Sequence, residues 1–358
     1  MRCHCCLKES ENDFCRTCSH ELFGKSNFSA TLKFTLPSIA QGRDRRAQRI
    51  SISGAQPKFS LHIENRELAP TDRGGTYILK PATSMQFRLF ADMPANEHVT
   101  MQMARQIFKL NVADSALLKF PGGEFTYLTK RFDIRDDGTR IHQEDFAQIA
   151  GLSSDANGSN FKYESLSYEE IAELMKQHVS AYTVAAEQFF KTLLFNYLVS
   201  NGDAHIKNFS LYSPHRDGVY ELAPAYDLMN TSLHTDDFRT ALDLFKDEEN
   251  CNGKFFKDNG FYGASDFLEF AKRIGIAEKR AAKFIKDTIA HLPEMETMLD
   301  RSFLSDEARL LYKNSLRDRA KSLKMGKQKI GTFCFGLFTP FPIFLEYFYN
   351  SGLGQNKE

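Results

Sequence analysis

The hydrophobic period of this chain changes near residue 166, and that change restricts the possible folds more than any other feature. Before it, short alternating runs such as 59–63 and 76–79 are separated by glycine-containing turns, which is typical of β-strands. After it, apolar residues recur at helical spacing, and residues 184–199 are apolar on nearly every side, as in a buried helix. This order predicts an α+β, bilobal fold with a small strand-rich N-terminal lobe and a larger all-α C-terminal lobe.

Local signals place several helices within this outline. In the first lobe, Pro94 precedes Asn96, which we expect to cap a helix with Val99 on its apolar face. In the second lobe, Ser167 and Glu170 form the pattern of a capping box. Further amphipathic helices are expected over 265–274, 277–291 and 305–323, because their first turns are acidic and their last turns basic.

The pattern divides the chain into a cysteine-rich head (1–24), an N-terminal lobe (25–165), a helical lobe (166–324) and an aromatic-rich tail (325–358). The 46 basic and 46 acidic residues cancel, which argues against a surface that coats nucleic acid. The N-terminus has no apolar signal-peptide core, and free thiols belong in a reducing compartment, so a cytoplasmic protein is expected. The apolar stretch 330–349 contains two prolines and a glutamate, which favours a buried or loosely ordered tail over a membrane span.

Five of the seven cysteines lie within the first 18 residues. Four of them form two C-x-x-C pairs separated by eight residues, namely Cys3 with Cys6 and Cys15 with Cys18. This spacing predicts a tetrahedral zinc site, which would be structural because four protein ligands leave no open position. The alternative is a set of reduced thiols without metal. Further ligand candidates are His4, Cys5 and His20.

The segment 201–211 carries the pattern that points to chemistry. Asp203 is followed five positions later by Asn208, which is the D-x-x-x-x-N spacing of a protein-kinase catalytic loop. In such a loop the Asp accepts the proton of the attacking hydroxyl, and the Asn holds magnesium against the phosphates. Lys207 is suited to stabilise the transferred phosphoryl group. Beyond a predicted hairpin over 209–222, Asp227 stands where a kinase has its second magnesium carboxylate.

The first lobe supplies two more groups in the order of a kinase. Lys80 ends the apolar run 76–80, as the phosphate-binding Lys of a kinase strand does, and Glu97 follows on a helix where it can pair with that Lys. Each feature has an ordinary explanation: a D-x-x-x-x-N pattern occurs by chance, Lys80 could end any strand, and Asp227 could cap a turn. Their order along the chain favours the kinase interpretation.

Five blocks of the sequence resemble, in order, the signature blocks of HipA-type serine/threonine kinases, the toxins of bacterial type II toxin–antitoxin pairs. The blocks are residues 51–58, 130–133, 142–146, 201–208 and 222–228, and the resemblance runs from about residue 50 to 323. It implies a HipA-like kinase fold and an ATP- and magnesium-dependent serine/threonine protein kinase. The Ser-Ile-Ser-Gly pattern at 51–54 is most similar to the compact HipT branch.

The resemblance also implies a role for particular residues. Asp203 would be the catalytic base, Asn208 and Asp227 would bind magnesium, and Lys80 would hold the nucleotide phosphates. Adenine would lie against a hinge made of Arg131, Phe132 and Asp133.

Residues 51–58 would form the loop that covers the phosphates, with Gln56 and Lys58 in contact with ATP. In this family a serine of the loop is autophosphorylated, which silences the kinase. Ser51 aligns with that position and Ser53 offers a second acceptor. A phosphoserine, with a charge of about −1.5 to −2, would repel the ATP phosphates.

The same resemblance implies partners. A HipB-like antitoxin would bind the kinase, so contact with DNA would be indirect, and a separate small HipS-like protein can supply the N-terminal subdomain that compact members lack. The substrate would be an aminoacyl-tRNA synthetase, and no membrane partner is expected. The sequence departs from the family at Lys130, where the hinge commonly begins with Glu.

Other functions remain open from the sequence. The first is a catalytically silent, kinase-like corepressor that binds a DNA-binding antitoxin, and the second is a small-molecule kinase on the same fold. A zinc-knuckle nucleic-acid binder is disfavoured by the balanced charge.

Overall fold

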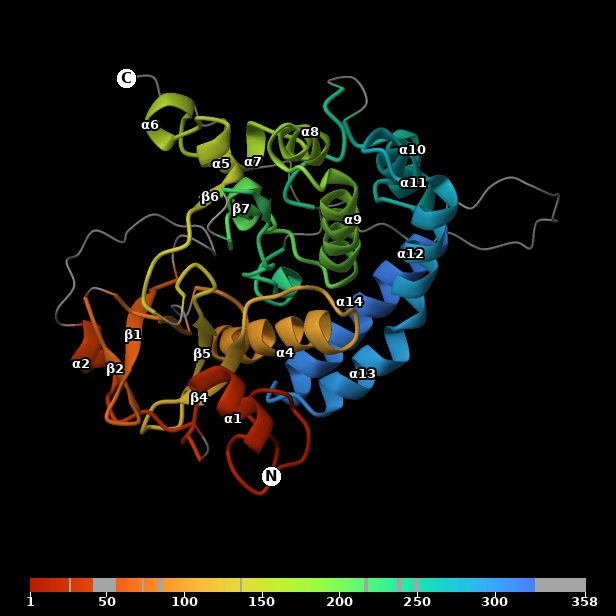
Figure 1. The fold of residues 1–358 in the computed structure, drawn as a ribbon. Helices are drawn as coiled ribbons and strands as arrows, with labels where there is room; N and C mark the ends of the chain where they lie inside the picture. The colour runs from red at the N-terminus through yellow and green to blue at the C-terminus, as the bar shows by residue number, and fades with distance from the viewer. Residues whose placement is uncertain are drawn as a thin grey trace, which may run out of the picture. The chain divides into compact units, whose positions relative to one another are not determined.

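The computed structural model describes residues 1–25, 27–40, 56–72, 74–82, 86–135, 137–215, 218–236, 240–247 and 251–325. Ser51 and Ser53, and the tail from residue 326 onward, lie outside the described residues. The order predicted from the sequence is confirmed: a sheet forms within residues 59–130, and the long helices other than α4 come from residues 168–324 (Figure 1).

A five-stranded antiparallel sheet forms the first lobe, in the order β2-β1-β3-β5-β4. The alternating runs predicted from the sequence place Leu61 and Leu79 fully inside the core. The central strand, β3, is bonded to β1 on one side and to β5 on the other, so Lys80 lies on firmly held backbone. The strands are β1 (Phe59–Glu64), β2 (Glu67–Pro70), β3 (Tyr77–Pro81), β4 (Ser115–Lys119) and β5 (Phe125–Lys130).

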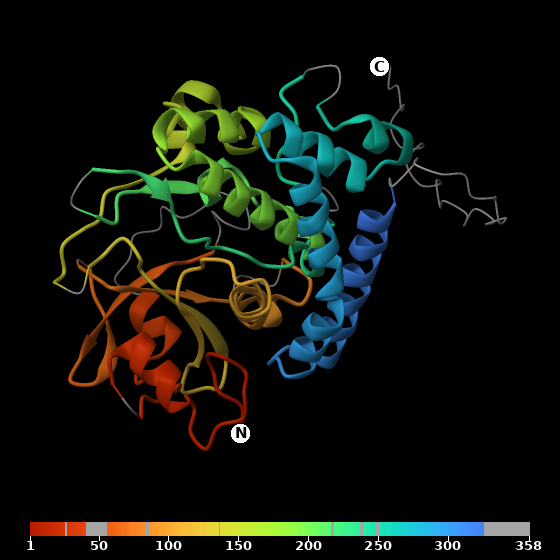
Figure 2. The same ribbon diagram turned by 45° about the vertical axis from the view of Figure 1, so that its right-hand side comes forward.

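Helix α4 (Met93–Gln106) packs on β4 and β5 and also on α13 (Leu292–Asp300), and Figure 2 views it nearly end-on between the two lobes. The prediction that Asn96 caps this helix is wrong. The helix begins at Met93, because Pro94 is compatible with a first turn whose N–H groups have no helical partner. Asn96 is buried inside the helix instead, donates to the Asn230 carbonyl at 2.8 Å and accepts from the Asn230 N–H at 3.1 Å. This pair joins α4 to the second lobe.

The helical lobe also carries a short three-stranded sheet. β7 (Ser210–Tyr212) and β8 (Glu221–Leu222) form the hairpin predicted from the sequence, and β6 (Gln143–Asp145) pairs with the other edge of β7. The hydrophobic period does not reveal this last pairing, because β6 lies far from β7 in the sequence. A strand from before residue 166 therefore belongs to the second lobe.

The predicted helices of this lobe are present. α8 (Tyr168–His178) begins with the expected capping box, in which the Glu170 N–H donates to the Ser167 hydroxyl at 3.2 Å and the Ser167 N–H to the Glu170 carboxylate at 2.7 Å. α9 (Tyr182–Leu198) is the buried central helix, and the amphipathic segments form α11 (Ala264–Arg273), α12 (Glu278–Ala290) and α14 (Asp306–Lys324). Within the described ranges, no helix combines the length and the apolar character needed to cross a bilayer.

The shorter helices of both lobes are α1 (Arg16–Phe23), α2 (Leu36–Ala40), α5 (Phe146–Ile149), α6 (Ser154–Asn157), α7 (Phe161–Glu164) and α10 (Lys254–Asn259), with 3-10 turns η1 (Phe90–Asp92), η2 (Ile206–Asn208) and η3 (Thr231–Leu233).

The cysteine-rich head packs into the core of the first lobe. Cys3 and Phe14 are buried in one hydrophobic cluster with Leu61 and Leu79 of the sheet. Leu7, in contrast, is buried in the larger cluster that contains α4 and the C-terminal helices. The head thus contributes to both cores of the molecule.

Candidate active site

Lys80 lies between two carboxylates. Its ammonium Nζ is 2.6 Å from Glu97 Oε1 on α4, and it also contacts Asp227 Oδ1 of the second lobe. The Lys80 and Glu97 side chains are almost fully buried, at 4% and 3% exposure. Lys58 Nζ, just before β1, is 3.7 Å from the other oxygen of Asp227. The structure therefore brings together four of the residues that the sequence singled out.

The charged side chains of this group shift one another's pKa values. Burial alone would lower the pKa of Lys80, but Asp227 and Glu97 raise it above its ordinary value, so the ammonium stays charged. Burial would raise the pKa of Asp227, yet Lys80 and Lys58 hold it below its usual range. Burial dominates for Glu97 and raises its pKa to about 7. A fixed cation with an ionised carboxylate beside it is suited to binding a phosphate together with a metal ion.

Asp227 has a left-handed backbone, with φ of 56°. This conformation is costly for a non-glycine residue and persists where neighbours fix it. Here Ala225, two residues before Asp227, is fixed by the first lobe, because its N–H donates to the Asn111 carbonyl at 2.8 Å and its carbonyl accepts from the Ala113 N–H at 3.0 Å. The strained turn aims the Asp227 carboxylate at Lys80.

The D-x-x-x-x-N loop follows α9 and is held by its own polar groups. The Gly202 N–H donates to the Thr231 hydroxyl at 2.8 Å, and the Asp203 N–H to the Asn201 side chain at 3.2 Å. The Asp203 carboxylate accepts a hydrogen bond of 2.5 Å from the Tyr163 hydroxyl of α7. Asp203 is thus positioned from two directions, by the loop and by α7.

Asn208 offers a side-chain oxygen that the described residues leave without a hydrogen-bond donor. Its side-chain Oδ1 is buried and accepts no hydrogen bond from the described residues. A buried carbonyl oxygen without a donor is costly unless a ligand satisfies it, and magnesium takes oxygen ligands from carboxylates and amides. Asn208 Oδ1 and the Asp227 carboxylate are therefore both of the ligand type that a divalent cation takes.

The segment that carries Asn208 is tied to the segment that carries Asp227. The Tyr226 hydroxyl is hydrogen-bonded to Ser210 Oγ at 2.5 Å and donates to the Lys207 carbonyl at 2.9 Å. The Lys207 ammonium lies 3.1 Å from Asp145 Oδ2 at the end of β6. In this structure Lys207 is thus paired with a carboxylate of the second lobe.

A cleft of about 280 Å³ opens beside the Lys80 group. Its lining includes Arg131, Phe132 and Asp133, the predicted hinge, which follows β5. The Arg131 guanidinium donates two hydrogen bonds to Asp133, at 2.9 and 2.5 Å. The Phe132 ring stacks on Tyr226 with centroids 5.8 Å apart. The hinge therefore gives the cleft an apolar surface, the Phe132 ring, beside the Arg131–Asp133 ion pair, whose two charges cancel.

Gln56, which belongs to the predicted phosphate-covering loop 51–58, is anchored to β3. Its side-chain amide donates to the Pro81 carbonyl at 3.0 Å and is buried. The loop therefore reaches β3 immediately beside Lys80. Ser51 and Ser53 lie outside the described residues.

Sequence reasoning gave no role to Tyr163, and it included Tyr226 and Asp145 only as members of the signature blocks 222–228 and 142–146. Tyr226 directly precedes Asp227, so its position was a usable signal. Tyr163 and Asp145 lie far from the loops that they contact, and no spacing rule connects them to those loops.

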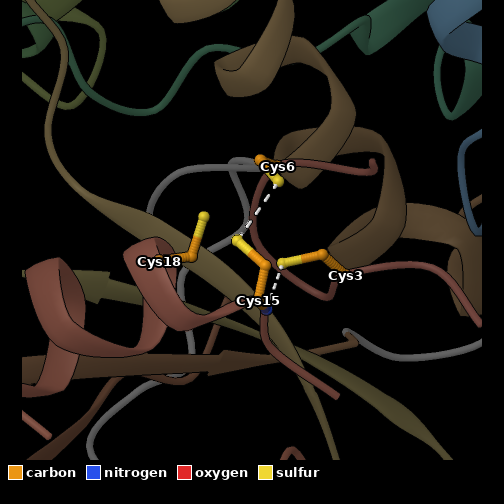
Figure 3. A group of neighbouring side chains, drawn as sticks. All are labelled: Cys3, Cys6, Cys15 and Cys18. Atoms are coloured by element: carbon orange, nitrogen blue, oxygen red, sulfur yellow. Dashed lines mark hydrogen bonds between the residues drawn. The ribbon is translucent and has the colours of Figure 1, made fainter. Parts of the chain in front are cut away.

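The four paired cysteines form a second, separate cluster (Figure 3). The sulfur atoms of Cys3, Cys6, Cys15 and Cys18 all lie within 4.8 Å of one another, and those of Cys6 and Cys15 are 3.9 Å apart. Zinc–sulfur bonds of about 2.3 Å in a tetrahedron place sulfur atoms about 3.8 Å apart. The Cys15 N–H also donates to Cys3 Sγ at 3.2 Å. The cluster therefore fits a tetrahedral metal ion.

A protein-kinase-like fold is indicated by a Lys on the central strand of an antiparallel sheet that pairs with a Glu on the adjoining helix, by a D-x-x-x-x-N loop, and by a second aspartate at the cleft. The family model for the HipA-like C-terminal domain matches residues 50–295, which is more than half of the chain, and the chain belongs to that family.

Individual relatives agree with this membership. A Haemophilus influenzae protein that carries a provisional kinase name is 29% identical over 299 residues, which cover 80% of this chain and 85% of that protein. The serine/threonine-protein kinase toxin HipA of Shewanella oneidensis is 28% identical over 298 residues, covering 76% of this chain and 64% of the toxin. This chain thus spans slightly less than two thirds of that toxin.

A solved structure shows the same fold. It is the complex of HipA, HipB and operator DNA from Shewanella oneidensis MR-1, with a TM-score of 0.61 and 22% identity over 79% of this chain and 66% of that one. The bilobal α+β, HipA-like fold predicted from the sequence is confirmed.

Proposed function

We propose that this protein is an ATP- and magnesium-dependent serine/threonine protein kinase that acts as the toxin of a type II toxin–antitoxin pair. The observation that carries the proposal is the meeting of Lys80, Glu97 and Asp227 at the cleft, with the unsatisfied oxygen of Asn208 on the adjoining loop. An ordinary structural ion pair explains Lys80 and Glu97, but it explains neither the strained backbone of Asp227 nor the Asn208 oxygen that finds no donor among the described residues.

Each group has a defined task in this proposal. Lys80, fixed by Glu97, binds the phosphates of ATP, and the hinge 131–133 receives adenine. Asp227 and Asn208 would hold magnesium, which when bound neutralises phosphate charge. Asp203 accepts the proton of the acceptor hydroxyl, for which its carboxylate is already oriented by Tyr163.

Lys207 would supply positive charge to the transferred phosphoryl group. Its side chain is 43% exposed, and among the described residues its ammonium pairs with the Asp145 carboxylate. Because its side chain is in contact with solvent, the Lys207 ammonium can exchange that carboxylate for a phosphate.

The loop before Gln56 is the proposed regulatory element. Autophosphorylation of Ser51 or Ser53 would place about two negative charges on a loop whose end lies beside Lys58 and Lys80. Such a group would compete with the nucleotide phosphates for the same ammonium groups.

The partners proposed from the family are a HipB-like antitoxin, through which DNA would be contacted indirectly, and a small HipS-like protein. The solved relative is itself a complex with HipB and operator DNA, and this chain covers 66% of that HipA chain. The proposed substrate is an aminoacyl-tRNA synthetase, whose modification would inhibit translation.

The test is transfer of labelled phosphate from ATP to the chain itself and to proteins of a lysate. Asp203→Asn and Asp227→Asn should each reduce transfer by at least 100-fold, since general-base and metal-site groups contribute about that much or more. Mass spectrometry of the active protein should find phosphate on Ser51 or Ser53. Thermal melting of each variant controls for folding.

The outcomes separate the rival functions. Normal transfer by either folded variant would remove the assignment. A wild-type chain that binds an antitoxin but transfers no phosphate would identify a silent corepressor. Label found only in small molecules would identify a small-molecule kinase.

A further inference from the structure

The first half of the cysteine-rich head docks on helix α4. The Cys5 carbonyl accepts a hydrogen bond from His98 Nε2 at 2.8 Å, and the Cys6 carbonyl accepts one from Gln106 Nε2 at 3.0 Å. His98 directly follows Glu97, the residue that pairs with Lys80, and is completely buried. Two successive carbonyls of the Cys3–Cys6 turn thus hold α4 near its middle, at His98, and at its last residue, Gln106.

The second half of the head docks on strand β3. The Tyr77 hydroxyl donates to the Leu22 carbonyl at the end of α1, at 2.7 Å, and the Tyr77 ring lies 6.1 Å from that of Phe23. Tyr77 is three residues before Lys80 on the same strand. Each half of the head therefore contacts one of the two elements that carry the Lys80–Glu97 pair.

The cysteine cluster lies where these halves meet. Cys3 and Cys6 flank the turn that holds α4, whereas Cys15 and Cys18 lie at the beginning of α1, which holds β3 (Figure 3). A bond from each sulfur to one ion would join the two halves rigidly. Four thiolates in a tetrahedron suit zinc, although an iron ion can occupy the same geometry.

We propose that a zinc ion bound by Cys3, Cys6, Cys15 and Cys18 fixes the spacing between α4 and β3 and thereby positions Glu97 against Lys80. The four cysteines are positioning residues, because the nucleotide cleft is lined by other side chains. The effect on catalysis rests on the proposed kinase function, whereas the metal site and its mechanical effect do not.

The first experiment measures metal content in the purified full-length protein by elemental mass spectrometry. One zinc per chain is expected in the wild type, and less than 0.1 in Cys6→Ser and Cys15→Ser. Cys251→Ser and Cys5→Ser should keep the full zinc content, because neither thiol belongs to the cluster. Iron in place of zinc, no metal, or loss of zinc in Cys5→Ser would overturn the assignment.

The second experiment tests the mechanical link by hydrogen exchange, with no need for catalysis. Removing zinc from the wild type with a chelator should speed exchange in residues 93–106 and 77–81, and adding zinc should restore protection. The helix 278–290 serves as an internal reference. Faster exchange confined to residues 1–25 would refute the link. Because the wild-type chain is used, a cysteine variant that fails to fold leaves this test intact.

The third experiment is a double-mutant cycle on phosphate transfer. Zinc removal should slow the wild type about tenfold but should slow Glu97→Gln less than twofold, since the pair that zinc positions is already broken in that variant. Equal slowing in both backgrounds would show that zinc only stabilises the fold. A wild type that binds zinc but transfers no phosphate would refute the proposed function and leave the metal site standing.

Discussion

Replacing Lys80 with methionine should destabilise the protein by about 3–5 kcal/mol at pH 7, which is the usual cost of removing one member of a buried ion pair. The structure favours a value near the upper end of this range. Lys80 neutralises two carboxylates, and both Lys80 and Glu97 are less than 5% exposed. Asp227 would keep Lys58 at 3.7 Å, whereas Lys80 is the ion-pair partner of Glu97 among the described residues.

Replacing Glu97, the other member of the pair, should reduce the free energy of unfolding much less. In Glu97→Gln, Lys80 keeps its contact with Asp227, so no buried charge loses every partner, and a cost of about 1 kcal/mol is expected. The double variant Lys80→Met/Glu97→Gln should recover part of the stability lost in Lys80→Met, since the orphaned carboxylate is gone.

The cost of Lys80→Met should also depend on pH. Burial raises the pKa of Glu97 to about 7 from an ordinary value of 4.5, and removal of the neighbouring cation can only raise it further. A folded pKa above the unfolded one means that this contribution to stability is complete below pH 4.5 and is lost as the pH rises. The wild type already loses most of this contribution at pH 7, so the Glu97 share of the difference between Lys80→Met and wild type should shrink by only about 0.4 kcal/mol from pH 7 to pH 4.5.

Urea unfolding followed by circular dichroism measures these differences, since the chain has no tryptophan to report by fluorescence. Lys283→Met is the matched control: its partner Asp287 is one helical turn away and the lysine is 70% exposed, so a loss of about 0.5 kcal/mol or less is expected. A Lys80→Met variant within 1 kcal/mol of wild type, or a Glu97→Gln variant equally unstable, would refute the reasoning.

Two further predictions concern single contacts. Tyr163→Phe should lower kcat/KM for phosphate transfer severalfold, because the Tyr163 hydroxyl positions the Asp203 carboxylate that is proposed to accept the substrate's proton. Unchanged or faster transfer would show that this hydrogen bond does not position the base. Burial raises the pKa of Asp266 to about 6 from 3.8, so its stabilising contribution is complete below pH 3.8 and is lost above pH 6. Asp266→Asn should therefore gain about 3 kcal/mol over wild type between about pH 3.5 and 7 in urea titrations, and a constant difference would contradict this.

Features with a short-range cause were predictable from the sequence. The Ser167–Glu170 capping box forms because its partners are three residues apart. The hairpin over 209–222 has its turn between its own strands. The two C-x-x-C pairs lie within 18 residues, so they can meet without help from the rest of the fold.

The placement of Asn96 shows where local reasoning fails. Asparagine is a favoured N-cap residue, yet Asn96 lies inside the helix, because its side-chain amide bonds to the backbone of Asn230 in the other lobe. Burial of α4 outweighs the capping preference, which is worth only about 1 kcal/mol. No local sequence pattern indicates that Asn230 will lie against this helix.

The sequence by itself determined the order of the lobes, the helix and strand periods, and the residue types that a kinase-like site requires. Those properties follow from side-chain chemistry and from spacing along a single segment. Only the tertiary structure decided that Tyr163 contacts Asp203, that β6 joins β7, and that the cysteine-rich head contacts both α4 and β3. These contacts join segments distant in the chain, and their free energy comes from hydrogen bonds and packing that exist only after the segments have been brought together.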